Sequence, residues 1–324
     1  MQAKVDELMR DYAGSQPGAS VLVLRDGAAV VRASYGRANR DQRIAVTPAT
    51  NFRLASVSKQ FTAACILLLM EEGKLRLDDP IAQWFPSLPP ATREITVRQL
   101  LTHTSGLIDY EDVIPPSLTR QLKDADVLML LESQNRSYFP PGTAYRYSNS
   151  AYVLLGLIVE KVSGRSFRDF LSERIFQPLG MRNTVAHVEG RTVVKHRAYG
   201  HSHEKGEWVR TDQSQTSATL GDGGIYSSID DLARWDAALY DGRLLKPETW
   251  AMAFTPATPT DDPTVEYGFG WRITGETLWH SGESIGFRNV LVRYPKRHLT
   301  VIVLTNRNDP EPYRLALTIA DWAQ

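Results

Sequence analysis

A serine and a lysine three residues apart open the most apolar helix that this chain predicts. Ser56 and Lys59 belong to the stretch RLASVSKQFTAACILLLMEEGKL. Because residues i and i+3 share one face of a helix, the two side chains can touch. A serine hydroxyl becomes a nucleophile when a base removes its proton, and burial among apolar residues lowers the pKa of a lysine. The pair therefore predicts nucleophilic catalysis, with free N–H groups at the start of the helix to stabilise an oxyanion.

The alternative interpretation of this pair is an N-cap serine followed by a surface lysine. A second Ser-x-x-Lys, which begins at Ser202, lies in a polar stretch, and we expect it to form an exposed loop. Two further motifs favour chemistry at the first copy. The only Tyr-Ser-Asn of the chain begins at Tyr147, and a His-Ser-Gly that begins at His280 precedes a predicted strand.

In this order, the three motifs resemble the signature set of the serine penicillin-recognising hydrolases. The resemblance is to the branch with class C β-lactamases, D-alanyl-D-alanine carboxypeptidases, D-aminopeptidases and related esterases. The stretches LLTHTSGL, YSNSAYVLLGLIVEKVSG, PLGM and YGFGW also look like that branch, so the resemblance covers nearly the whole chain. It implies an α/β (α+β) fold of the β-lactamase/transpeptidase type. In that fold an antiparallel sheet flanked by helices and a mainly helical lobe enclose the active site.

The resemblance implies a role for each motif residue. Ser56 would be acylated, Lys59 would help to activate it, and Tyr147 would act as general base and then protonate the leaving group. The ordinary pKa of a tyrosine is about 10, so Tyr147 would need Lys59 close by. The main-chain N–H groups of Ser56 and Glu283 would form the oxyanion hole. The substrate-binding residues would be Asn149, His280, Ser281, Gly282 and Glu283.

Three residues near these motifs have structural interpretations as well. Tyr147 lies among other aromatic residues, so a packed ring is the alternative to a proton relay. We expect His103 to hold a turn through hydrogen bonds. For Asp222, in the stretch GDGGIYSS, we expect a role in a turn, with substrate contact as the alternative.

The chain departs from the family at His280, where β-lactamases and D-alanyl-D-alanine peptidases usually have lysine. Histidine has an ordinary pKa near 6.5 and is mostly neutral at pH 7, and Glu283 adds a negative charge beside it. Unless Arg288 or Arg272 compensates, we expect this wall to hold an anionic substrate poorly. The departure favours a neutral ester or amide, or a substrate whose amine pairs with Glu283.

Strand patterns lie at both ends of the chain, and helical patterns lie between them. Two runs rich in valine, leucine and alanine flank Asp26-Gly27 and predict a β-hairpin, and Val/Ile-rich runs predict strands after residue 266. Apolar spacing predicts helices at the N-terminus, over 57–72, 118–132, 149–163 and 166–176, and at the C-terminus. We therefore expect a discontinuous α/β lobe, residues 1–80 and 225–324, and a mainly helical lobe, residues 81–224.

Composition limits the partners. Lysine plus arginine equals aspartate plus glutamate at 37 each, which gives no electrostatic case for nucleic acid or a membrane surface. No apolar run is long enough to predict a membrane span. Cys65 has no partner for an intrachain disulfide and reads as a small buried residue. No zinc-type spacing or phosphate-binding loop occurs, so we expect no metal or cofactor.

Localisation stays open at this point. The first residues do not resemble a signal peptide. Either the protein is cytoplasmic, or it is periplasmic or secreted and a leader has been removed.

The leading hypothesis is a serine hydrolase that forms an acyl-enzyme on Ser56 and cleaves esters or small amides. A class C-type β-lactamase or a D-alanyl-D-alanine carboxypeptidase is the alternative with the same mechanism. A non-catalytic, penicillin-binding-like sensor is the alternative of another class, and the intact set of Ser56, Lys59, Tyr147 and Asn149 weighs against it. The expected partner is a small-molecule ester, amide, peptide or β-lactam substrate.

Overall fold

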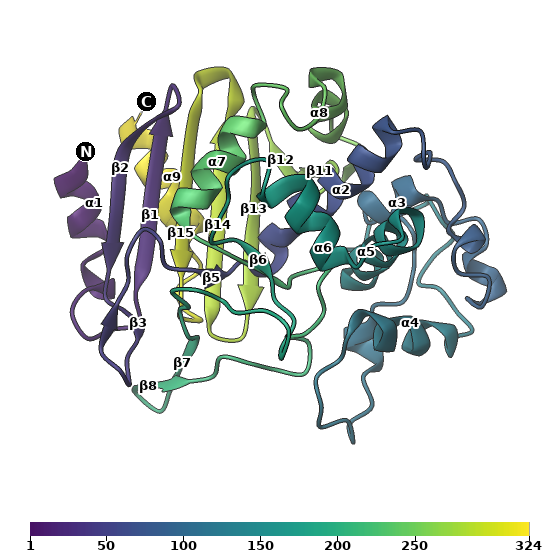
Figure 1. Ribbon diagram of the computed structural model, residues 1–324, viewed down its shortest axis with the longest axis horizontal. Coiled ribbons are helices and arrows are strands. Elements are labelled where there is room, and N and C mark those ends of the chain that lie inside the picture. The colour runs from purple at the N-terminus through teal and green to yellow at the C-terminus, as the bar shows by residue number, and fades with distance from the viewer. Residues whose placement is uncertain (324) are drawn as a thin grey trace.

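An eight-stranded antiparallel sheet, built from both ends of the chain, is the centre of the computed structural model, which describes residues 1–323 (Figure 1). Its strand order is β10-β11-β12-β13-β14-β15-β1-β2. The strands are β1 (Ala19–Arg25), β2 (Ala28–Tyr35), β10 (Thr258–Pro259), β11 (Glu266–Tyr267), β12 (Arg272–Thr274), β13 (Thr277–Ser284), β14 (Phe287–Tyr294) and β15 (Leu299–Thr305).

Two predicted hairpins are confirmed in this sheet. Asp26 and Gly27 join β1 to β2, and both have positive φ angles, 51° and 77°, as a tight two-residue hairpin turn requires. The predicted pair around Pro295 is β14 and β15, in which Leu291 lies opposite Ile302. Every residue of β15 is buried, because this central strand is covered on both faces.

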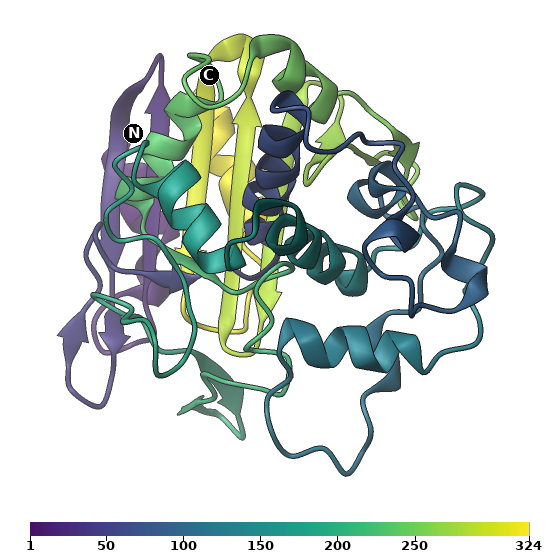
Figure 2. The ribbon, with the colours of Figure 1, turned by 45° about the vertical axis from the view of Figure 1, so that its right-hand side comes forward.

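Helices cover the two faces of the sheet. The helices are α1 (Gln2–Leu8), α2 (Lys59–Glu71), α3 (Val97–Leu101), α4 (Asp124–Glu132), α5 (Asn149–Ser163), α6 (Phe167–Leu171), α7 (Ile229–Ala238), α8 (Pro247–Ala253) and α9 (Tyr313–Ala323). Helices α1 and α9 lie on one face, and α2 and α7 lie on the other (Figure 1, Figure 2).

Side-chain alternation along β1 shows why both faces are apolar. Val21 and Val23 pack in the core with α1 and α9, whereas Leu22 and Leu24 pack in the larger core with α2 and α7. Successive side chains of a strand point to opposite faces, so a strand that is covered on both sides reads as one continuous apolar run.

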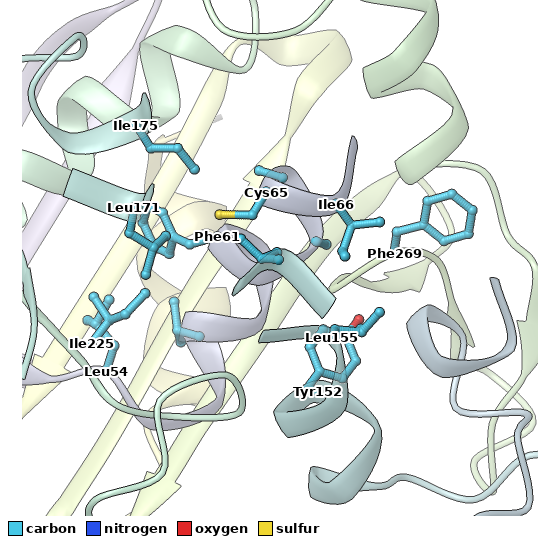
Figure 3. Close-up of a cluster of buried hydrophobic side chains, with 14 of the residues drawn as sticks. Leu54, Phe61, Cys65, Ile66, Tyr152, Leu155, Leu171, Ile175, Ile225 and Phe269 are labelled. Carbon is cyan, nitrogen blue, oxygen red and sulfur yellow. The ribbon is translucent and has the colours of Figure 1, made fainter. Parts of the chain in front are cut away.

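Helix α2 runs through the middle of the larger core. Its residues Lys59 to Leu69 are all buried, as expected for a helix that is apolar on every side. Figure 3 shows Phe61, Cys65 and Ile66 of α2 close to Leu155 of α5 and Leu171 of α6. Cys65 has no exposed surface, and burial raises the pKa of its thiol, so the prediction of a small buried residue is confirmed.

Helix α5 has the bounds that the sequence predicts. The Ser148 side chain accepts a hydrogen bond from the N–H of Ala151 at 3.1 Å, which caps the first turn. Gly164 ends the helix with a φ of 70°. In Figure 1, α3, α4 and α5 gather at the end of the molecule away from β1 and β2. Within residues 1–323, no helix combines the length and apolar character needed to cross a bilayer.

Other predicted bounds are wrong. The helix predicted over 57–72 begins at Lys59, because residues Ala55–Ser58 form a 3₁₀ turn. The helix predicted over 118–132 begins only at Asp124, and the one predicted over 166–176 becomes a π-helical turn from Ser172. The loop predicted at Ser202 is instead the first strand and turn of a β-hairpin.

Short strands complete the fold around the large sheet. The sequence analysis did not predict most of them. They are β3 (Arg37–Asn39) with β4 (Ile44–Ala45), β5 (Phe52–Arg53) with β9 (Ile225–Ser227) and β6 (Val185–Ala186), and β7 (His201–Glu204) with β8 (Glu207–Arg210). The strand order β5-β9-β6 matters most for the site, because it holds the chain just before Ser56. The division into two lobes at residues 80 and 225 stays a prediction.

Candidate active site

Ser56 lies on a tight turn between β5 and α2. Ala55, just before it, has a φ of 49°, a left-handed conformation that is uncommon for residues other than glycine. The N–H of Leu54 donates to the carbonyl of Ile225 at 2.8 Å, which ties the turn to β9. A Cβ on Gly282 would lie 2.0 Å from the carbonyl oxygen of Leu54, so only glycine allows β13 to approach this closely. These contacts fix Ser56 between α2 and β13.

Lys59 is fully buried, and its ammonium group has three acceptors. Nζ donates to Oγ of Ser56 at 3.1 Å, to Oδ1 of Asn149 at 2.8 Å and to the main-chain oxygen of Asp222 at 2.9 Å. A lysine ammonium has three protons and accepts no hydrogen bonds. The structure therefore brings together Ser56, Lys59 and Asn149 as the sequence predicts.

Tyr147 lies next to Lys59. Nζ of Lys59 is 4.9 Å from the centre of the Tyr147 ring. The ring centres of His103 and His280 lie 4.4 Å and 6.2 Å from that of Tyr147. The Tyr147 hydroxyl is buried and has no hydrogen-bond partner within residues 1–323. The packed ring that the sequence offered as an alternative is present, and the hydroxyl is still available for proton transfer.

His280 lies inside β13 opposite Leu291, and it precedes the predicted strand, which is β14. Its Nδ1 lies 2.7 Å from the carbonyl oxygen of Ser281, and its Nε2 lies 2.9 Å from the hydroxyl of Tyr267. A carbonyl only accepts, so Nδ1 carries the proton and Nε2 accepts from the tyrosine. Burial, with smaller contributions from the charges of Arg272 and Lys59, moves the pKa of His280 well below 6.5. His280 is therefore neutral at pH 7.

His103 holds the turn that precedes α5, as the sequence predicts. Its Nδ1 accepts the N–H of Ser148 at 3.0 Å, and its carbonyl accepts the N–H of Arg146 at 3.0 Å. The side chain is fully buried, and this burial moves its pKa well below 6.5. His103 thus fixes the backbone of Arg146 and Ser148, on either side of Tyr147.

A small cavity of about 50 Å³ opens beside Ser56. Ser56 and Glu283 both line it, which puts the two residues of the predicted oxyanion hole on one cavity. Asn149 also lines it. Two acidic residues, Glu111 and Asp222, form part of the same lining.

Asp222 does more than stabilise a turn, which was its expected role. Its Oδ2 accepts a hydrogen bond from the Tyr110 hydroxyl at 3.0 Å, while its Oδ1 is buried and has no partner within residues 1–323. Oε1 of Glu111 accepts from Nδ2 of Asn149 at 3.0 Å. Burial raises the pKa of Glu111, and the charges of Asp109 and Asp222 add to the shift. Sequence analysis missed Glu111, because nothing in its local pattern relates it to Ser56.

Two further carboxylates hold the backbone that carries the Lys59 acceptors. Oδ2 of Asp109 accepts the N–H of Asn149 at 2.5 Å. Asp124, the first residue of α4, accepts the N–H of Leu220 at 3.0 Å and that of Gly221 at 3.2 Å, just before Asp222. Burial raises the pKa of Asp124 to about 7, and the charge of Asp222 contributes. Sequence analysis missed both residues, because their partners lie 40 and 97 residues away.

The arginines near β13 differ in what they contact. Arg288 pairs with Glu283 at 2.6 Å, so the charge of Glu283 is compensated although 71% of that side chain is exposed. The guanidinium carbon of Arg272 lies 5.5 Å from the centre of the Tyr147 ring, and its Nε is buried without a hydrogen-bond partner in the described part of the chain. Arg272 is therefore a second cation next to Tyr147, in addition to Lys59.

Comparison with known proteins places this geometry in a family. A family model described as Beta-lactamase matches residues 1–324. The chain belongs to the beta-lactamase family. It is 32% identical over 321 residues to penicillin-binding protein 4* of Bacillus subtilis (strain 168), in a match that covers 92% of this chain and 70% of that protein.

Two solved structures resemble this family member over most of their length. The penicillin-binding protein from Bacillus halodurans matches with a TM-score of 0.85 and 28% identity, over 99% of this chain and 98% of that one. The D-amino acid amidase from Ochrobactrum anthropi SV3, complexed with L-phenylalanine amide, matches with a TM-score of 0.79 and 27% identity, over 94% of this chain and 89% of that one. The predicted fold class is confirmed, and the protein is a serine hydrolase of the beta-lactamase family.

Proposed function

We propose that this hydrolase cleaves small amides and esters whose acyl part bears a primary amine, through an acyl-enzyme on Ser56. The observation that carries the proposal is the pair of carboxylates, Asp222 and Glu111, in the cavity next to Ser56. A buried carboxylate oxygen without a partner is costly unless a cation or donor reaches it. The ammonium group of an amino-acid amide supplies both a charge and donors.

The structural likeness to the D-amino acid amidase supports the same class of substrate, since that protein is complexed with an amino-acid amide. The small cavity favours a small acyl group. Glu283 was the predicted partner of an amine, but its ion pair with Arg288 makes it a weaker candidate than Asp222.

The steps follow from the distances around Ser56. Oγ of Ser56 attacks the substrate carbonyl carbon as its proton passes to the deprotonated oxygen of Tyr147, the general base, and the Lys59 ammonium beside the Tyr147 ring stabilises that oxygen. The oxyanion is bound by the main-chain N–H groups of Ser56 and Glu283. Tyr147 protonates the departing nitrogen or oxygen as the carbon–heteroatom bond breaks, and its unpartnered hydroxyl is free to reach it. Water then attacks the acyl-enzyme as Tyr147 takes its proton, and the acid leaves as Tyr147 returns that proton to Oγ of Ser56.

Arg272 favours a second candidate. A class C-type β-lactamase or a D-alanyl-D-alanine carboxypeptidase must bind a substrate carboxylate, and the neutral His280 does not provide a charge for it. Arg272, beside Tyr147, is placed to do so. The two candidates therefore differ in the charge of the substrate. The first binds an amine through Asp222 and Glu111, and the second binds a carboxylate through Arg272.

The test compares kcat/KM for alanine p-nitroanilide, its N-acetylated form, a short-chain p-nitrophenyl ester and a chromogenic cephalosporin. Ser56→Ala from the same preparation is the blank. We expect the free amine to be preferred over its acetylated form by about tenfold or more, as for hydrogen bonds to charged groups. A preference for the cephalosporin would replace this proposal with the β-lactamase. A burst of labelling without turnover would indicate the non-catalytic sensor.

Variants connect that preference to the cavity. Asp222→Asn and Glu111→Gln should each reduce the preference for the free amine, because each removes one negative charge. Glu94→Gln, at an exposed position between α2 and α3, is the matched control. If the preference is the same in all three variants, the carboxylates do not bind the amine.

A further inference from the structure

The cavity beside Ser56 also contains a buried arginine. Arg53, in β5, is 3% exposed and lines the cavity with Ser56. One terminal nitrogen, Nη2, donates to the carbonyl of Ser217, while Nε is buried and has no partner within residues 1–323. Arginine is almost never fully buried unless its charge is paired. Here the described residues provide a single carbonyl and no carboxylate within ion-pair distance.

Asp222 and Arg53 line one cavity and form no ion pair with each other. Different parts of the fold hold the two side chains in place. Tyr110 binds Asp222, and Arg53 lies opposite Tyr226 in the pairing of β5 with β9, with its guanidinium carbon 5.9 Å from the Tyr226 ring centre. The cavity thus carries a negative and a positive group, and each has an atom without a partner.

We propose that the acyl group of the substrate bears a carboxylate as well as an amine, as in aspartyl and glutamyl amides, and that Arg53 binds the carboxylate. This inference rests on the proposed function, because the amine is assigned to Asp222 and Glu111. A guanidinium binds a carboxylate through two parallel hydrogen bonds. The hydroxyl group of Thr216 in the lining adds a further polar group.

Four p-nitroanilides with one leaving group separate the two charges. Butyryl p-nitroanilide has neither charge, 2-aminobutyryl has the amine, glutaryl has the carboxylate, and glutamyl has both. The amino acids are used in both configurations. We expect kcat/KM for the glutamyl compound to exceed that for the 2-aminobutyryl compound by about tenfold or more, as for charge-assisted hydrogen bonds.

Three variants assign the effect to Arg53. Arg53→Gln removes the charge but keeps an N–H donor for Ser217, and it should bring the ratio of glutamyl to 2-aminobutyryl turnover close to one. Arg53→Lys keeps the charge and should retain part of the ratio. Arg98→Gln removes a surface arginine that pairs with Asp78, and it should leave the ratio as in the wild type.

The outcomes distinguish the two proposals. If wild-type enzyme prefers 2-aminobutyryl to butyryl but treats glutamyl and 2-aminobutyryl alike, the carboxylate site is wrong and the proposed function stands. If the amine has no effect but glutaryl is preferred to butyryl until Arg53 is changed, the carboxylate site stands and the proposed function fails. If Arg53→Gln lowers all four rates equally together with Tm, Arg53 is structural and the inference is overturned.

Discussion

The two sides of the site, that of Lys59 and that of Tyr147, are built in opposite ways. On one side, Lys59 donates three hydrogen bonds. Two of its acceptors, Asn149 and Asp222, belong to backbone that Asp109 and Asp124 hold in turn. On the other side, Tyr147 packs against the rings of His103 and His280 and lies beside Arg272, and its hydroxyl has no partner in residues 1–323.

This difference separates two requirements of catalysis. A buried charge has to be held in place, and the fixed acceptors around Lys59 do this before any substrate arrives. A group that carries protons must be free to move them, and an unpartnered hydroxyl does not have to break a hydrogen bond first. A buried hydroxyl without a partner costs stability, so its presence next to Lys59 is better explained by chemistry than by packing.

The largest effect should come from the residue that both sides share. Ser56→Ala should lower kcat by about 10⁴-fold or more and abolish covalent labelling, while Tm changes little. Intact-mass measurement after incubation with a penicillin or a p-nitrophenyl ester checks the labelling. Ser202→Ala, in the second Ser-x-x-Lys, is the control and should label normally. Labelling that survives in Ser56→Ala would remove Ser56 from the mechanism.

Tyr147→Phe tests the Tyr147 hydroxyl, which has no hydrogen-bond partner within residues 1–323. We expect kcat to fall by about 10²- to 10⁴-fold with Tm unchanged or raised, because the deleted hydroxyl makes no hydrogen bond. Tyr152→Phe is the counterpart, since its hydroxyl donates to the carbonyl of Leu101 at 2.8 Å. It should lose about 1 kcal/mol of stability. A rate within threefold of wild type for Tyr147→Phe would mean that the hydroxyl is only a packed group.

Asp124→Asn tests the carboxylate that holds the backbone next to Lys59, through the pH dependence of stability. Between about pH 4 and the folded pKa of about 7, folded Asp124 keeps a proton that the unfolded chain has lost. Unfolding then releases a proton, so this group's contribution to stability is present below pH 4 and is lost as pH rises towards 7. From pH 5 to pH 8, we therefore expect the free energy of unfolding of Asp124→Asn to fall by about 1–3 kcal/mol less than that of the wild type. Urea unfolding at pH 5 and pH 8 measures it, and identical pH dependence in both proteins would contradict it.

His103, which packs against Tyr147, should change stability with pH in the direction opposite to that of Asp124. Its pKa is lowered by burial, so the unfolded chain binds a proton below about pH 6.5 that the folded protein does not. Its contribution to stability is therefore present above pH 6.5 and is lost as pH falls below that value. His103→Gln should weaken the loss between pH 7.5 and 5, measured by urea unfolding, whereas His203→Gln, at an exposed position, should not. An equal loss in all three proteins would show that His103 titrates normally.

The smallest effect should come from Glu283, at the rim. Its side chain is 71% exposed and paired with Arg288, and exposed ion pairs contribute about 1 kcal/mol or less. Glu283→Gln should therefore change the ratio of neutral ester to cephalosporin turnover by less than about threefold. A change of more than tenfold would restore Glu283 as the group that excludes anionic substrates.

The elements that the sequence predicts well are those whose signals are local. The apolar helix α2, the hairpin at Asp26-Gly27 and the bounds of α5 follow from periodicity, turn residues and caps within a few positions. The start of α2 was missed because Ala55 takes a left-handed conformation that tertiary contacts impose. The local pattern did not predict strand β13, because His280, Ser281 and Gly282 interrupt its run of apolar residues.

The sequence by itself predicted which groups would supply the chemistry, because Ser56, Lys59, Tyr147 and Asn149 occur in motifs with a distinctive order and spacing. Only the tertiary structure decided what surrounds them. Glu111, Asp222 and Arg53 line the cavity from segments far apart in the chain, and Lys59 reaches an acceptor 163 residues away. Charge recognition depends on distances across the folded molecule, and these are set by packing of elements against one another, which no local pattern encodes.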